Sequence, residues 1–142
     1  MKQTIKMVIR FLTLILWMWL IFGFSSQDAS TSSVQSGGIV EFLSRIFHIE
    51  VTENFVRKTA HFILYFVLGI LAYNSLGRLK NVKFWVVLAF CVLYAASDEL
   101  HQTFVSGRAG MIKDVLLDSC GSLLGMLLYL KLPRKEKIKN EV

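Results

Sequence analysis

Residues 59–76, TAHFILYFVLGILAYNSL, form a stretch of eighteen in which His61 is the only ionisable side chain apart from two tyrosines. A helix that spans a bilayer needs about 20 predominantly apolar residues, because the hydrocarbon core is about 30 Å thick. In lipid a free backbone N–H or C=O finds no partner, so such a stretch must be helical. It therefore predicts a transmembrane helix over residues 55–76.

Three further stretches are almost free of charge, namely residues 11–24, 84–97 and 115–132. With their flanks they predict spanning helices over residues 5–24, 82–102 and 112–132. Composition agrees, since 54% of the 142 residues are hydrophobic and only 18% are charged, against roughly 25% in soluble domains. The expected fold is all-α: one domain over residues 1–142, a four-transmembrane-helix bundle that ends in a basic cytoplasmic tail over residues 133–142.

The basic residues indicate the orientation of this bundle. If the N-terminus is cytoplasmic, eleven of the sixteen lysines and arginines lie on the cytoplasmic side and five lie outside. Cytoplasmic loops carry the excess of Lys and Arg, so we expect both termini in the cytoplasm. The net charge of +6 is then a topology signal, and no nucleic-acid partner is expected, because no basic stripe interleaves with aromatic residues. Cleavage of the first block as a signal peptide, after residues 23–25, stays open as an alternative.

The first outer loop, residues 25–58, predicts an irregular stretch followed by a short amphipathic helix. Six serines precede two glycines, and the apolar residues of 39–49 then recur at close to helical period. This helix would lie at the outer membrane surface or over the mouth of the bundle, or it would merely pack on the bundle. Cys91 and Cys120 fall inside predicted helices without metal-ligand spacing, so both are expected to be buried as small apolar residues.

Ionisable groups occur at one depth in three of the predicted helices; they are His61, Asp98, Asp114 and Asp118. Counted at 1.5 Å per residue from the basic residue that ends each helix on the cytoplasmic side, their depths agree within about 5 Å. Because the hydrocarbon core is about 30 Å thick, all of them fall in one layer near the outer leaflet.

Spacing also places the polar groups of each helix on one face. Asp114 and Asp118 are four residues apart, and residues three or four apart are neighbours on a helix surface. A carboxylate in lipid is costly and faces the bundle interior or a wet cavity. We therefore expect one outward-opening polar pocket, in which Lys58 and Arg108 pair with the acids. Two glycines, at 121 and 125, continue the stripe of Asp114 and Asp118 inward and should let a neighbouring helix approach closely.

A metal site is the less favoured interpretation of this layer. Its possible ligands are His61, Asp98, Glu99, His101 and Asp114. The chain has no HExxH motif, and the acids have cations nearby. We therefore expect no metal and no cofactor. Solvated positions on the loop side are the alternative for Glu99 and His101.

These residues fall in motifs through which the chain resembles the VanZ-like family of small bacterial integral membrane proteins. The motifs are FSSQ at 24–27, RKxAHF at 57–62, SDExHQxF at 97–104, GR at 107–108 and DxxxDxxGxxxG at 114–125. The resemblance covers nearly the whole chain and is loosest at 27–54 and after 133. It implies a multi-pass protein of the bacterial plasma membrane, and the family takes its name from a member linked to teicoplanin resistance. Many relatives carry Asn at the Asp118 position, so this chain has one more acid there.

Two functions follow for such a pocket, and a third interpretation is structural. The first is binding or modification of an envelope component, a lipid headgroup or a peptidoglycan precursor, by ligand-binding residues Lys58, Glu99, Gln102, Arg108, Asp114 and Asp118. The second is an intramembrane enzyme on a lipid-linked substrate, with His61 and Asp98 as the catalytic acid–base pair. In it Lys58 or Arg108 would stabilise developing negative charge. The third is a polar network that only holds helices together. Membrane lipid is the expected partner, and no oligomeric state is predicted.

Overall fold

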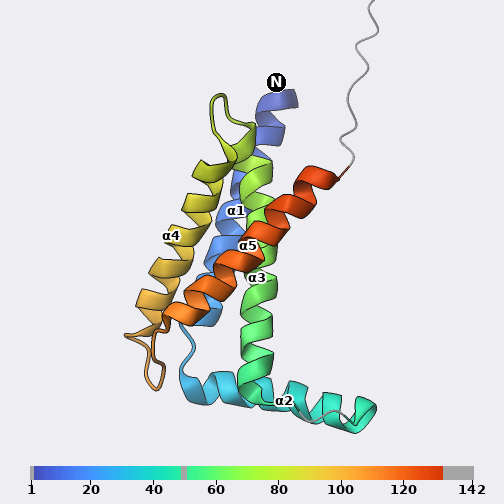
Figure 1. Cartoon of the computed structure of the whole chain (residues 1–142), viewed down its shortest axis with the longest axis vertical. Helices are drawn as coiled ribbons and strands as arrows, with labels where there is room; N and C mark the ends of the chain where they lie inside the picture. The colour runs from blue at the N-terminus through green and yellow to red at the C-terminus, as the bar shows by residue number, and fades with distance from the viewer. Residues whose placement is uncertain (1, 49–50, 133–142) are drawn as a thin grey trace, which may run out of the picture.

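The computed structural model describes residues 2–48 and 51–132, and these residues form helices and no strand (Figure 1). In chain order the elements are α1 (Lys2–Ser25), α2 (Ala29–Phe47), α3 (Glu53–Ser75), the short 3-10 helix η1 (Leu76–Arg78), α4 (Phe84–Gln102) and α5 (Ile112–Lys131). The all-α class is confirmed. The four helices expected from the apolar blocks begin and end within three residues of their predicted bounds. The predicted basic tail over 133–142 lies outside the described residues.

Within residues 2–48 and 51–132, three helical segments are long and apolar enough to cross a membrane: α1, α3 together with η1, and α4. Their outward faces carry large apolar side chains such as Trp19, Trp85 and Leu93, each at least 70% exposed. An apolar surface of this kind is expected where helices face lipid. Helix α5 has comparable length, but two lysines and two aspartates make it less apolar than the other three.

Helix α5 crosses α3 at close range in the middle of the bundle (Figure 1). A Cβ atom added to Gly125 would lie 2.0 Å from the carbonyl oxygen of Phe66, and one added to Gly121 would lie 2.6 Å from that of Phe62. Such distances leave no room for any side chain, so the two backbones are in contact. The prediction that the glycine stripe of α5 faces a neighbouring helix is therefore confirmed.

Helix α1 is held to the bundle by apolar packing and by side chains that donate to backbone carbonyls of its neighbours. Trp17 Nε1 donates to the Leu64 carbonyl at 2.9 Å, and the Tyr94 hydroxyl donates to the Met18 carbonyl at 2.7 Å. Internal partners of this kind are needed wherever water is absent. The buried apolar core includes Leu14, Ile21, Leu68, Val87 and Met126.

Helix α2 is longer than the sequence predicted. The side chain of Asp28 accepts a hydrogen bond from the Thr31 N–H at 2.7 Å, which caps the helix and lowers the pKa of this exposed carboxyl. Ser32 and Ser36 are buried, so one face of α2 turns toward the bundle. The irregular serine-rich stretch is thus a wrong prediction, because capping and packing outweigh weak local propensity. The amphipathic helix predicted over 39–49 is the second half of α2, and residue 49 lies outside the described residues.

The two cysteines differ in burial. Cys91 of α4 is buried, as expected, but Cys120 of α5 is exposed. The expectation for Cys120 is wrong because its helix turns the adjacent Gly121 and Ser122 toward α3, where Ser122 Oγ donates to the Tyr65 carbonyl at 3.1 Å. Cys120 therefore lies on the outward side of α5.

Candidate functional site

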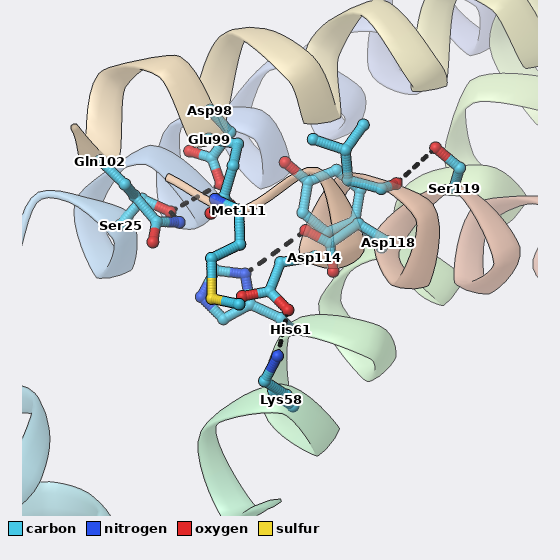
Figure 2. A network of polar contacts seen from close by, with 12 residues as sticks. Ser25, Lys58, His61, Asp98, Glu99, Gln102, Met111, Asp114, Asp118 and Ser119 are labelled. Carbon is cyan, nitrogen blue, oxygen red and sulfur yellow. Dashed lines mark hydrogen bonds and ion pairs between the residues drawn. The ribbon is translucent and has the colours of Figure 1, made fainter. Parts of the chain in front are cut away.

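The side chains predicted at one depth converge with neighbouring polar groups at the end of the bundle away from the N-terminus of α1 (Figures 1 and 2). Four helices supply them: Ser25 from α1, Lys58 and His61 from α3, Asp98, Glu99 and Gln102 from α4, and Asp114 and Asp118 from α5. Helices α3, α4 and α5 each present groups three or four residues apart, which lie on one face of that helix. The residues that counting placed at one depth therefore also lie close together in space.

The centre of the site is a triad of His61, Asp98 and Asp118. One nitrogen of the imidazole and one oxygen of each carboxylate all lie within 4.8 Å of one another. Asp98 is 3% exposed and Asp118 is 1% exposed. His61 Nδ1 is 3.6 Å from Asp118 Oδ2, which is within ion-pair range but longer than a hydrogen bond. Two carboxylates and one imidazole therefore lie together where solvent has little access to the carboxylates.

Each carboxylate of this triad is only partly satisfied. Ser25 Oγ donates to Asp98 Oδ2 at 2.7 Å, and Gln102 Nε2 donates to Ser25 Oγ at 3.3 Å. Asp98 Oδ1 and Asp118 Oδ1 are buried and have no hydrogen-bond partner among the described residues. The hydroxyl of Tyr65, four residues after His61 on α3, is buried without a partner as well. Buried polar atoms without partners are rare and call for an explanation.

The two basic residues expected in the pocket, Lys58 and Arg108, have different kinds of partner. Lys58 Nζ forms an ion pair with Asp114 Oδ1, as predicted, and both side chains are partly exposed. Arg108 was expected to pair with an acid, but its Nη1 donates to the Gln102 amide oxygen at 3.3 Å. No ion pair of Arg108 occurs within residues 2–48 and 51–132. The turn at Gly107, whose φ is 73°, places Arg108 beside the end of α4, and partial burial lowers the pKa of its guanidinium.

Glu99 and His101 have different surroundings, although they are two residues apart. Glu99 is 6% exposed, and its Oε1 accepts a hydrogen bond of 2.7 Å from the Met111 N–H just before α5. A solvated loop-side position is therefore wrong for Glu99, which ties the start of α5 to the end of α4. His101 stacks on the Phe22 ring, with centroids 4.5 Å apart, and its Nε2 is 3.2 Å from Ser26 Oγ. It is not part of the triad.

A small cavity and a larger groove border this site. A small cavity of about 20 Å³ is lined by Arg57, Lys58, His61, Glu99, Gln102, Asp114, Leu117 and Asp118. That volume is enough for one water molecule or one ion. A larger groove of about 400 Å³ lies between α2 and the ends of α1 and α3, and its wall is mainly apolar. Arg57 and His61 line both hollows.

Three residues of the site are missing from the predicted set of catalytic and ligand-binding residues: Ser25, Arg57 and Tyr65. Ser25 has the right depth, but nothing in its local sequence indicates that Asp98 would be its partner. Arg57 precedes Lys58 and was counted only as an outside charge. Tyr65 shares the helix face of Lys58 and His61, at i+7 and i+4, but this spacing alone assigns it no chemical role.

Comparison with known proteins gives a family match. The model of the VanZ/LLP1 family matches residues 10–133 of the chain. The matched segment contains all eight predicted site residues. Neither a curated protein nor a solved structure matches the chain.

Proposed function

The chain belongs to the VanZ/LLP1 family, and from this premise we propose that it is a multi-pass protein of the bacterial plasma membrane that holds a phosphate-bearing lipid headgroup at the outer leaflet. In this proposal α1, α3, α4 and α5 span the bilayer, α2 lies at the outer surface, and both termini are cytoplasmic. The apolarity of α1, α3 and α4 supports spanning. The distribution of basic residues supports the orientation. The backbone contact of α5 with α3 supports its place as the fourth span.

One observation carries the binding proposal: an apolar groove runs up to a polar centre. The groove of about 400 Å³ is lined by apolar residues such as Phe24, Ile39 and Leu64, and its wall also includes His61, whose imidazole belongs to the polar triad. A lipid has the same division, since its chains are apolar and its headgroup is polar. The groove suits the upper part of an acyl or isoprenoid chain, and the polar end suits a headgroup.

The charges of the groove favour phosphate as the headgroup. Its ionisable lining residues are Arg57, His61 and Arg108, and no carboxylate is among the described residues that line it. Arg57 donates to the Asn54 side-chain oxygen and Arg108 donates to Gln102, so neither guanidinium is neutralised by a described acid. Guanidinium groups bind phosphate through paired, charge-assisted hydrogen bonds.

Binding can be measured on the purified full chain in detergent by displacement of a fluorescent phosphatidylglycerol. Arg57→Gln and Arg108→Gln should each weaken binding about tenfold or more, because a hydrogen bond to a charged group contributes roughly 1.5–3 kcal/mol. Arg45→Gln is the matched control, since Arg45 lies on the exposed side of α2 and pairs with Glu41. Equal affinity for phosphatidylglycerol and neutral diacylglycerol would contradict the proposal.

Two sources of the phosphate can be separated in the same assay. A phospholipid of the outer leaflet and a polyprenyl-diphosphate-linked cell-wall precursor share the phosphate but differ in chain and in the attached sugar. Preference for the precursor would link the protein to peptidoglycan assembly, and its removal from cells should then change their susceptibility to teicoplanin. Preference for phosphatidylglycerol, with unchanged susceptibility, would assign the groove to membrane phospholipid.

An intramembrane enzyme is the second candidate, and one contact favours it. The Ser25 hydroxyl donates to a buried carboxylate, Asp98, at 2.7 Å. A hydroxyl so placed can lose its proton as it attacks an acyl or phosphoryl centre, and His61 could protonate the leaving group. Release of product from a lipid-linked substrate by purified protein, abolished by Ser25→Ala with lipid binding retained, would establish this activity. Saturable binding without turnover would exclude it for that substrate.

A further inference from the structure

We infer that His61, Asp98 and Asp118 form a binding site for one divalent transition-metal cation, Zn²⁺ or Mn²⁺. Three helices, α3, α4 and α5, each contribute one side chain, and the three possible ligand atoms lie within 4.8 Å of one another. Ligand atoms bonded to one zinc ion at about 2.0–2.2 Å are at most about 4.4 Å apart, so small side-chain rotations would close the site.

The unpartnered atoms point to a missing cation. Asp98 and Asp118 are 3% and 1% exposed, and each has one buried oxygen without a partner among the described residues. The Tyr65 hydroxyl is also buried without a hydrogen-bond partner in the described part of the chain, and it lies on the same face of α3 as His61. A buried charge without compensation is disfavoured, and a metal ion between the carboxylates would supply compensation to both.

The nearby side-chain cations do not fill this role. The expectation of no metal rested on the lack of an HExxH motif and on Lys58 and Arg108, which were expected to neutralise the acids. In the structure Lys58 pairs with Asp114, and Arg108 contacts the amide of Gln102. The two central carboxylates are left with His61, whose Nδ1 lies 3.6 Å from Asp118. The nearby basic residues therefore give no reason against a metal at this pair of acids.

The donor set selects the kind of metal. Imidazole nitrogen suits zinc and its neighbours, whereas carboxylate oxygen alone suits Mg²⁺ or Ca²⁺, so the mixed set favours Zn²⁺ or Mn²⁺. The hydrogen bond from Ser25 would hold the second oxygen of Asp98, as outer partners of metal ligands commonly do. Three protein ligands leave a position open, and the cavity of about 20 Å³ beside His61 and Asp118 would give water or a headgroup oxygen access to it.

The metal content of the purified full chain tests this inference. The chain should carry an affinity tag other than polyhistidine and be purified in detergent without chelator. We expect about one Zn²⁺ or Mn²⁺ per chain by plasma mass spectrometry. After chelator treatment, titration with Zn²⁺ or Mn²⁺ alone should raise the unfolding temperature, because a cation that binds only the folded state stabilises it.

Substitution locates the ion. Asp98→Asn and Asp118→Asn should each weaken binding by more than about 10–100-fold, the loss seen when only an outer partner of a ligand is removed. Asp114→Asn is the matched control, because Asp114 is on the same face of α5 but pairs with Lys58, and it should keep the metal. Equal loss in Asp114→Asn and Asp118→Asn would overturn the assignment.

The wild-type protein decides the question even if a variant fails to fold. A stripped wild-type chain that neither binds Zn²⁺ or Mn²⁺ nor gains stability from them would overturn the inference, and the two carboxylates would then share a proton. Metal content does not depend on the lipid groove. Unchanged lipid binding in Arg57→Gln with the metal retained would count against the groove alone, whereas a metal-free wild type that binds lipid would count against the metal alone.

Discussion

The Ser25 hydroxyl donates a 2.7 Å hydrogen bond to Oδ2 of Asp98, although the two residues are 73 positions apart in the chain. The bond joins the last residue of α1 to the last full turn of α4, and both side chains are buried. It therefore fixes the ends of two apolar helices at the depth of the polar centre. The other oxygen of Asp98, Oδ1, is buried and has no hydrogen-bond partner among the described residues.

Ser25→Ala should destabilise the protein by about 1–3 kcal/mol, because it removes the only described partner of a buried carboxylate oxygen. Ser26→Ala is the control, since the Ser26 hydroxyl is exposed and its contacts, with the Phe22 carbonyl and with His101 Nε2, involve no buried carboxylate. Thermal unfolding in detergent measures both. A Ser25 variant as stable as the Ser26 variant would mean that the hydrogen bond contributes no stability.

Gly125→Ala should lower folded yield sharply, because its Cβ would lie 2.0 Å from the Phe66 carbonyl oxygen and would force α3 and α5 apart. Overpacking typically costs about 1–3 kcal/mol, and contact with backbone costs more than contact with a flexible side chain. Gly23→Ala has open space around the added atom and should be tolerated. Yield by size-exclusion chromatography distinguishes them, and equal yields would refute close contact of the two helices.

Lys58→Ala should cost less than about 1 kcal/mol, because the ion pair of Lys58 with Asp114 is partly exposed and solvent weakens it. The small loss should shrink further between low and high salt, where screening increases. Unfolding temperatures of wild type and variant at the two salt concentrations measure this. A large, salt-independent loss would instead indicate that Lys58 compensates the buried acids.

Membrane topology can be tested with single cysteines on a background from which Cys91 and Cys120 have been removed. Ser106→Cys, on the loop between α4 and α5, should react with an impermeant thiol reagent in intact cells. Lys80→Cys, on the loop between η1 and α4, should react only after permeabilisation. Both positions are exposed, so access depends on the side of the membrane. The opposite pattern would invert the proposed orientation, and equal reactivity would contradict it.

Depth in the bundle was predictable from the sequence, whereas the pairing of charges was not. A helix rises a fixed distance per residue, so residue counts alone placed His61, Asp98 and Asp118 in one layer. Which cation meets which acid depends on the rotation of each helix and on the loop that follows it. The turn at Gly107 directs Arg108 to Gln102, and no local pattern encodes that contact.

The extent of helix α2 was likewise not predictable from its local sequence. Serines and paired glycines favour irregular chain locally, and the prediction for residues 25–38 followed that preference. In the structure a cap at Asp28 starts the helix, and the burial of Ser32 and Ser36 holds one face of it against the bundle. Tertiary contacts of this kind outweigh differences in propensity of about 1 kcal/mol per residue.

The contact of α3 with α5 through Gly121 and Gly125 also affects the order in which parts of the molecule unfold locally. Two helices whose backbones touch cannot part a little at a time, so amide protons along that seam exchange only when the whole pair opens. Helix α2 has no such seam, and its start is tied by one backbone bond, from Ala29 N–H to the Ser106 carbonyl at 3.2 Å. Deuterium should therefore enter α2 well before it enters the crossing of α3 and α5, and the groove beneath α2 would open while the rest of the bundle stays closed.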